Sequence, residues 1–273
     1  MNTRMSPQRA ASTKAAEVLL ECRGLSKHFG ALQAVNNVSF SVGKGEAIGI
    51  AGPNGAGKST LFDLVSSNQP LSSGQIIYDG QDVTNTPPEE LCHQGIARTF
   101  QLNAAFDSMT ALENVRVASY FGREHSLLPK LWFDRHSKDH AMQALERVGM
   151  ADKADQIVGN MPVLGRKLVM LAGALAIEPK LLLMDEPVGG LTPPEMAIFE
   201  DVVREVVNTG VTLVIVEHVM KFLFALVDRV LIMHQGELIF EGSRQEMLAD
   251  TQVVEIYLGK RTAEMLIKSV EST

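Results

Sequence analysis

A glycine-rich segment between a predicted strand and a predicted helix constrains the fold more than any other feature of this chain. The segment reads Gly52-Pro53-Asn54-Gly55-Ala56-Gly57-Lys58-Ser59-Thr60 and fits the phosphate-binding pattern G-x-x-x-x-G-K-[ST]. A strand-like run, residues 47–51, precedes it, and a helix-like run, residues 61–65, follows it. This order brings backbone N–H groups and the positive end of a helix to one anion. We therefore predict an α/β fold with a polyphosphate site at residues 52–60.

Individual positions of this loop predict individual contacts. Lys58 can reach the β- and γ-phosphates, and the Ser59 hydroxyl can hold Mg²⁺. The other predicted nucleotide contacts are Gly52, Asn54, Gly55, Ala56, Gly57 and Thr60. A glycine-rich turn without a ligand is the alternative, and both the Lys-Ser pair and the strand–loop–helix context argue against it.

Two adjacent carboxylates predict the metal contact and the general base. Residues 181–184 are a continuous apolar run, typical of a parallel strand buried on both faces, and they lead into Asp185-Glu186-Pro187. A carboxylate at the end of such a strand holds Mg²⁺ beside a phosphate loop, so Asp185 is the predicted metal contact. Glu186 is then placed to polarise an attacking water. The alternative is a solvated strand end.

Three further residues are candidates for the same site. His218 ends a predicted strand, where its imidazole can donate a hydrogen bond to a γ-phosphate oxygen; a surface histidine at a helix start is the alternative. Gln101 can contact Mg²⁺-bound water and so report on nucleotide, although it could also be an ordinary loop residue. Phe29 can stack on adenine or belong to the core.

The order of secondary-structure signals predicts an antiparallel β subdomain and an inserted helical subdomain. Strand patterns occupy residues 18–22, 34–42 and 75–80, around the phosphate loop. From about 102 to 176 the patterns are almost only helical, with a capping box at Thr110 and Glu113. After Pro179 strands and helices alternate again. We expect strands at 181–184 and 211–216, a hairpin at 230–240, and helices from Thr192 and from Arg244 to about Tyr257.

Composition narrows the class of protein. The net charge of −7 gives no support for a nucleic-acid partner bound through a basic surface. The two cysteines, Cys22 and Cys92, indicate neither a disulfide framework nor a metal cluster. No apolar stretch approaches the roughly 18–20 residues of a membrane span. Residues 1–17 and 259–273 are expected to be tails, the first disordered and without a signal core.

The order and spacing of these pieces resemble the nucleotide-binding subunit of ABC transporters over residues 18–258. The matching pieces are Phe29, residues 52–60, Gln101, Asp185-Glu186 and His218. Residues 97–101, 109–115, 179–187 and 255–259 are similar to the ATPase subunits of branched-chain amino acid importers. The resemblance implies ATP and Mg²⁺ as cofactors and a place on the cytoplasmic side of the cell membrane. It implies a second ATPase subunit, two permeases and a solute-binding protein as partners, with a groove near Gln101 for a permease helix.

One segment departs from the family. Where relatives have Leu-Ser-Gly-Gly-Gln, this chain has Met161-Pro162-Val163-Leu164-Gly165, so proline replaces the serine and leucine replaces a glycine. In the family this segment completes the ATP site of the opposite subunit. The departure therefore predicts an obligate heterodimer with unequal ATP sites.

We expect the chain to hydrolyse ATP and so energise an importer, with branched-chain amino acids as the first candidate. Urea or amide importers and the lipopolysaccharide-export type of ABC system share many of its features. A soluble ABC ATPase acting on ribosomes or DNA is the rival from another class, but the chain has neither two ATPase halves nor long coiled coils. A GTPase would need Asn-Lys-x-Asp, which is absent. Glu186 and His218 argue against a regulator that does not hydrolyse nucleotide.

Overall fold

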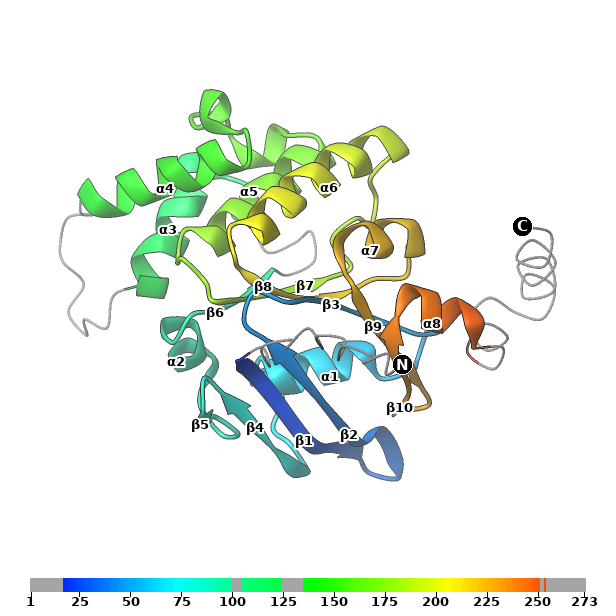
Figure 1. Ribbon diagram of the computed structural model, residues 1–273. Coiled ribbons are helices and arrows are strands. Elements are labelled where there is room, and N and C mark those ends of the chain that lie inside the picture. The colour runs from blue at the N-terminus through cyan, green and yellow to red at the C-terminus, as the bar shows by residue number, and fades with distance from the viewer. Residues whose placement is uncertain (1–16, 100–104, 124–134, 251–252, 254–273) are drawn as a thin grey trace, which may run out of the picture.

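A six-stranded sheet with the order β10-β9-β3-β8-β7-β6 forms the centre of the computed structural model, which describes residues 17–99, 105–123, 135–250 and 253 (Figure 1). Five neighbouring strands run parallel, and the edge strand β10 is antiparallel to β9. The carboxyl ends of the five parallel strands therefore meet at one edge. The strands are β3 (Ala47–Ala51), β6 (Ile96–Thr99), β7 (Leu181–Asp185), β8 (Thr212–Val216), β9 (Arg229–His234) and β10 (Glu237–Ser243).

Alternate residues of the central strands enter two separate hydrophobic cores. Every residue of β3, β7 and β8 is buried, which explains why their sequences are continuously apolar. On β7, Leu182 and Met184 enter one core, whereas Leu181 and Leu183 enter the other. This separation follows from the period of two along a strand, which turns successive side chains to opposite faces of the sheet.

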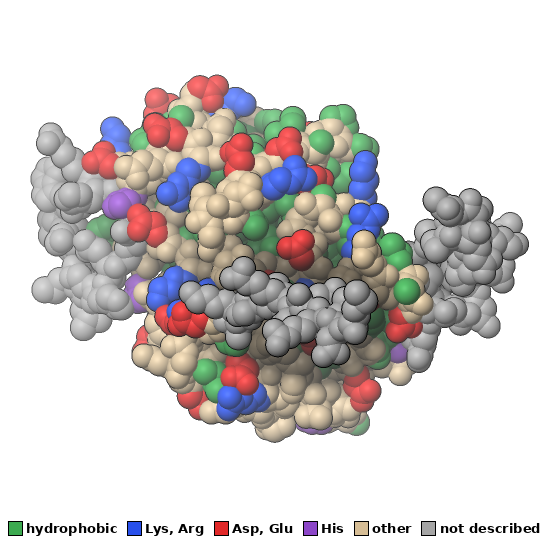
Figure 2. Space-filling view, in the orientation of Figure 1, with side chains coloured by type: hydrophobic (Ala, Val, Ile, Leu, Met, Phe, Trp, Pro, Cys, Tyr) green, Lys and Arg blue, Asp and Glu red, His purple; other side chains and the backbone are tan. Residues whose placement is uncertain are grey.

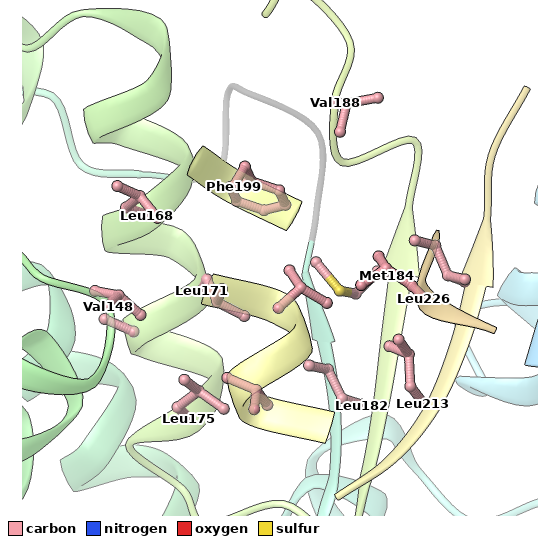
Figure 3. Close-up of a cluster of buried hydrophobic side chains, with 14 of the residues drawn as sticks. Val148, Leu168, Leu171, Leu175, Leu182, Met184, Val188, Phe199, Leu213 and Leu226 are labelled. Carbon is pink, nitrogen blue, oxygen red and sulfur yellow. The ribbon is translucent and has the colours of Figure 1, made fainter. Parts of the chain in front are cut away.

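The first core joins the sheet to the helices above it. Figure 3 shows Leu171 of α5 (Val163–Leu175) and Phe199 of α6 (Pro193–Asn208) beside Leu182 and Met184 of β7. Phe199 also packs against Phe222 of α7 (Met220–Leu226), with ring centroids 6.3 Å apart. The helical part and the sheet thus share one continuous apolar contact.

The second core joins the other face of the sheet to the phosphate-loop helix and a smaller sheet. Helix α1 (Lys58–Val65) buries Leu61, Phe62, Leu64 and Val65 there. Beneath it lies a four-stranded antiparallel sheet with the order β2-β1-β4-β5 (Figure 1). Its strands are β1 (Val18–Phe29), β2 (Leu32–Gly43), β4 (Ser73–Tyr78) and β5 (Gln81–Asp82). The predicted antiparallel β part is confirmed.

Helices dominate the described residues between 105 and 176, as predicted. They are α3 (Ala111–Arg123), α4 (Arg135–Arg147) and α5, with two short 3₁₀ turns, η1 (Ala151–Lys153) and η2 (Val158–Asn160). The capping box before α3 is present. The Thr110 N–H donates to Glu113 Oε2 at 2.8 Å, and the Glu113 N–H donates to Thr110 Oγ1 at 3.2 Å.

The sequence patterns do not predict three short elements that the structure contains. Helix α2 (Pro88–His93), strand β6 and helix α7 have six, four and seven residues, too few for a periodic signal. The predicted strand at 18–22 is also too short, because β1 continues to Phe29 through several irregularities of register.

The predicted helix from Arg244 to about Tyr257 is interrupted at Asp250, and residues 251–252 and 254–257 lie outside the described ranges. Helix α8 (Arg244–Ala249) ends at Asp250, whose backbone is extended with φ −84° and ψ 102°. Val253 is again helical, and the Asp250 side chain accepts a hydrogen bond from its N–H at 3.1 Å, as an N-cap residue does. The hairpin of β9 and β10 and the helix start at Thr192 are confirmed.

The surface in Figure 2 carries Lys and Arg side chains interspersed with Asp and Glu over its upper part. None of the helices in the described ranges is long and apolar enough to span a membrane. The expected tail at 1–17 lies almost wholly outside those ranges, which begin at Glu17, and the tail at 259–273 lies outside them completely.

Candidate nucleotide-binding site

The phosphate loop connects β3 to α1 in a conformation that requires glycine at two positions. Gly52 has φ +155°, and a Cβ atom there would lie 2.2 Å from the Met233 carbonyl oxygen. Gly57 has φ +99°, and its Cβ would lie 2.3 Å from the Ala34 carbonyl oxygen. Both distances are far shorter than a van der Waals contact. Neighbouring backbone therefore packs too closely against the loop for any side chain at these two positions.

Lys58 is buried at the start of α1, and its side chain folds back over the loop. Nζ donates to the carbonyl oxygens of Gly52 at 2.8 Å and Pro53 at 3.0 Å. Burial lowers the pKa of Lys58, and the charges of Glu186 and Asp185 oppose that effect. A polyphosphate bound at the loop would supply the negative charge that this desolvated ammonium group favours.

A cavity of about 510 Å³ opens over this loop. It combines the phosphate loop with Glu186, the start of β2 and the turn between β9 and β10. Its lining residues are Leu32, Gln33, Ala34, Asn54, Gly55, Ala56, Gly57, Lys58, Ser59, Thr60, Glu186, Gln235 and Gly236. Gln235 and Gly236 were predicted as a hairpin turn and not as part of a site. Only the pairing of β9 with β3 brings that turn to the loop.

Asp185 offers a buried carboxylate oxygen to a cation. Its Oδ2 accepts a hydrogen bond from Arg98 Nη2 at 3.0 Å, whereas its Oδ1 is buried and has no hydrogen-bond partner within the described part of the chain. Burial raises the pKa of Asp185, and the Arg98 charge opposes this rise. A carboxylate oxygen and the Ser59 hydroxyl are the hard ligands that Mg²⁺ prefers. Asp185 does not line the cavity over the loop, whereas Ser59 does, and the chemistry of the two groups fits the predicted magnesium ion.

Glu186 stands at the turn that follows β7. Its backbone is in the left-handed region, with φ +45°, and its N–H donates to the Val216 carbonyl oxygen at 2.9 Å. This geometry brings the side chain into the lining of the cavity, next to the phosphate loop. The unusual conformation of a non-glycine residue at a site of predicted chemistry is typical of functional positions.

His218 follows β8, and its side chain is 56% exposed. Its Nδ1 lies 3.4 Å from Oε2 of Glu217. His218 does not line the cavity over the loop, so a contact with nucleotide stays a prediction.

Glu217 is a site residue that the sequence reasoning missed. Its side chain is completely buried, and its carboxylate accepts hydrogen bonds from three backbone N–H groups. These donors are Val188 at 3.2 Å, His218 at 2.6 Å and Val219 at 3.0 Å. Glu217 therefore ties the loop after Glu186 to the loop of His218. The sequence did contain a signal for this residue, namely a charged side chain directly after an apolar strand.

Of the two remaining candidates, the structure describes Phe29 but not Gln101. Phe29 is 47% exposed at the end of β1, with Lys27 Nζ 5.0 Å from its ring centroid. It is therefore not a core aromatic. It does not line the cavity, whereas the nearby Leu32 does. Gln101 lies outside the described residues, so its predicted contacts stay predictions.

The 161–165 segment leads directly into α5. Pro162 is the residue before the first turn of that helix, and Met161 is buried. Arg166 fastens the segment, because its Nε donates to the Met161 carbonyl oxygen at 3.2 Å and its Nη2 donates to that of Gly159 at 2.5 Å. The segment is thus held at the amino end of α5.

A second cavity, of about 610 Å³, forms an apolar groove between the helical part and β6. Its walls come from α2, β6, α3 and α5, and Phe121 on its rim is 65% exposed. Residues that line it include Leu91, Ile96, Ala118, Phe121, Met170 and Ala174. We call this feature the apolar groove.

The fold and the loop geometry define an ATP-binding cassette, and the chain belongs to the ABC transporter family, whose model matches residues 35–189. It is the ATPase subunit of such a transporter.

Individual relatives make the comparison more specific. A probable branched-chain amino acid transport ATP-binding protein, LivG, of Methanocaldococcus jannaschii is 34% identical over 251 residues, which cover 89% of this chain and 98% of that protein. LivG of Escherichia coli K12, a high-affinity branched-chain amino acid transport ATP-binding protein, is 30% identical over 90% of this chain and 99% of its own length. The crystal structure of the ADP conformation of MJ1267, an ATP-binding cassette of an ABC transporter, superposes with a TM-score of 0.81 at 33% identity. That match covers 90% of this chain and all of the cassette.

Proposed function

We propose that this chain hydrolyses MgATP to energise an importer of branched-chain amino acids from the cytoplasmic side of the cell membrane. The observation that carries the proposal is the phosphate-loop cavity with Glu186 in its lining, on a chain that aligns almost end to end with branched-chain amino acid transport ATP-binding proteins. These relatives favour branched-chain amino acids over the urea, amide and lipopolysaccharide alternatives.

Each predicted site residue has a role in this proposal. Lys58 binds the β- and γ-phosphates, and Ser59 and Asp185 would hold a magnesium ion, which would supply positive charge beside the phosphates. Glu186 accepts a proton from the attacking water, and His218 donates a hydrogen bond to the γ-phosphate.

The buried Oδ1 of Asp185, which has no hydrogen-bond partner among the described residues, supports the metal role. Gln101 is proposed to contact the metal-bound water, and Phe29 to stack on adenine.

The proposed partners follow from the apolar groove and from the relatives. A short cytoplasmic helix of one permease would place apolar side chains in the groove, whose exposed Phe121 is otherwise costly to leave in water. A solute-binding protein outside the membrane would deliver the amino acid. We propose no nucleic-acid partner.

We further propose that the functional ATPase is a heterodimer with unequal sites. Pro162 has neither a hydroxyl nor an N–H group, and Leu164 adds a side chain near the start of α5. A facing γ-phosphate would therefore lose the donors that a serine supplies at a helix amino end, and the Leu164 side chain would restrict its approach. Losing one such donor typically costs about 10²–10³ in rate. The site made from this chain's phosphate loop and the partner's intact segment would carry most turnover.

Transport by the assembled complex tests the substrate. The chain, its partner ATPase and their two permeases are reconstituted in proteoliposomes with the cognate binding protein, and uptake of radiolabelled leucine, isoleucine and valine is compared with uptake of urea. ATP-dependent uptake of the branched-chain amino acids supports the proposal. Uptake of urea or an amide instead would refute it. The Glu186→Gln complex is the control for ATP dependence.

The asymmetry has its own test. The catalytic glutamate is replaced by glutamine in one ATPase subunit at a time, and the ATPase rate of the complex is measured. Glu186→Gln in this chain should lower the rate by about 10²-fold or more, the scale for losing a general base. The matching change in the partner should have a much smaller effect. Equal losses would sink the idea, as would a fully active homodimer of this chain.

A further inference from the structure

We propose that Arg98 is a positioning residue for the magnesium carboxylate Asp185, an inference that rests on the proposed metal role of Asp185. Arg98 lies on β6, whose register pairs it with Leu183 of β7, two residues before Asp185. Its side chain is only 10% exposed. One buried cation thus stands between the end of β7 and the phosphate-loop helix.

The hydrogen bonds of Arg98 connect two elements of the site. Nη2 donates to Asp185 Oδ2 at 3.0 Å. Nη1 donates to Asp63 Oδ1 at 2.7 Å and to Ser66 Oγ at 2.8 Å. Asp63 belongs to α1, and Ser66 caps its carboxyl end. The guanidinium group is planar and rigid, so these bonds fix Asp185 relative to α1.

Helix α1 begins at Lys58, and Ser59 follows. A restraint between Asp185 and α1 is therefore a restraint between the two proposed magnesium ligands, Asp185 and Ser59. Mg²⁺ demands near-octahedral geometry with short ligand distances, so it is sensitive to such a restraint. We infer that Arg98 sets the geometry in which the ion binds.

Arg98 also decides which oxygen of Asp185 is available. It occupies Oδ2, and the buried Oδ1 has no hydrogen-bond partner among the residues that the structure describes. A buried carboxylate is costly unless it is paired, and removal of Arg98 would free both oxygens to rotate or find other partners. The Phe62 ring, whose centroid lies 5.7 Å from the guanidinium carbon, helps to hold the cation in place.

The arrangement differs from a surface ion pair. Arg204 on α6 also has two carboxylate partners, Glu200 and Asp201, but both lie on its own helix, and its side chain is 44% exposed. Such pairs contribute little. Arg204→Met is therefore a matched control for Arg98→Met, since each change removes one arginine with two carboxylate partners.

The test is the magnesium dependence of ATP binding by the full chain. ATP affinity is measured by calorimetry in EDTA and at increasing Mg²⁺, which gives the midpoint of the magnesium effect. Arg98→Met should raise that midpoint by about 10–100-fold, the usual effect of removing a residue that orients a metal ligand. Affinity in EDTA should change little, because Lys58 and the loop remain. A merely structural role would lower both affinities together.

Parallel variants separate the possible failures. Arg98→Lys keeps the charge but cannot make both sets of bonds, so it should restore the midpoint only in part. If Arg98→Met does not fold, Asp63→Ala, at a half-buried position, should still raise the midpoint in the same direction by a smaller factor. An unchanged midpoint in the folded Arg98 and Asp63 variants overturns the inference, as does a shift of the same size in Arg204→Met.

Asp185→Asn distinguishes this inference from the proposed metal site. If Asp185→Asn raises the midpoint but the Arg98 variants do not, the metal site stands and the role of Arg98 is refuted. If Asp185→Asn leaves the midpoint unchanged, the metal role itself fails, and the inference about Arg98 fails with it.

Discussion

Replacing Glu217 by alanine should destabilise the protein strongly, because this carboxylate is buried and fully engaged in hydrogen bonds. The side chain is completely buried, and its two oxygens accept hydrogen bonds from the backbone N–H groups of Val188, His218 and Val219. Hydrogen bonds to a charged group contribute about 1.5–3 kcal/mol each, and a buried donor left unpaired costs about 1–3 kcal/mol. Such terms are not additive, because water can enter the space that the side chain leaves.

A second effect acts in the same direction. Lys167 on α5 is buried, which lowers its pKa, and the Glu217 charge opposes that decrease. We therefore expect Glu217→Ala to lower the free energy of unfolding by about 3–5 kcal/mol, mainly through the three lost hydrogen bonds. Glu217→Gln keeps the volume and one acceptor oxygen, so its loss should be about 1–3 kcal/mol.

Urea unfolding followed by circular dichroism measures both variants. Glu205→Ala, which removes an exposed carboxylate on α6, is the control and should change the free energy of unfolding by less than about 0.5 kcal/mol. If Glu217→Ala costs no more than this control, Glu217 does not hold the two loops. A larger cost for Glu217→Gln than for Glu217→Ala would contradict the argument from lost acceptors.

Three further predictions concern single side chains. Lys58→Ala should abolish tight MgATP binding in calorimetry, and an unchanged affinity would remove the basis of the nucleotide site. Gly57→Ala should lower both the unfolding midpoint and the ATP affinity, with a strain of about 1–3 kcal/mol, because its Cβ would meet the Ala34 carbonyl oxygen at 2.3 Å. Thr110→Ala should cost about 1 kcal/mol of stability, since it removes the acceptor of the Glu113 N–H, and should leave ATP affinity unchanged.

Local patterns were sufficient for the elements that carry strong periodicity or a fixed motif. The continuous apolar runs of β7 and β8 predict strands buried on both faces, because side chains of a strand covered on both sides are removed from water along its length. The loop at 52–60 predicts its own strand–loop–helix context, since its glycines are needed wherever backbone surrounds a phosphate. The capping box at Thr110 predicts the start of α3 for an equally local reason, the unpaired N–H groups of a first turn.

Other predictions failed or were not made, because their causes lie in tertiary contacts. The interruption at Asp250 is an exception, because its bond to Val253 is local and joins residues only three positions apart. The roles of Arg98 and Glu217 depend on partners that are distant in sequence, at Asp63 and Asp185 for the first and at Val188 for the second.

The sequence by itself therefore determined the fold class, the phosphate loop and the pair Asp185-Glu186, since each rests on neighbours along the chain. Only the tertiary structure decided which groups surround them. The turn at Gln235 reaches the loop because β9 pairs with β3, and Arg98 reaches Asp185 because β6 pairs with β7. Strand order is a property of the whole sheet, whose free energy depends on how all faces are buried together, so no local segment encodes it.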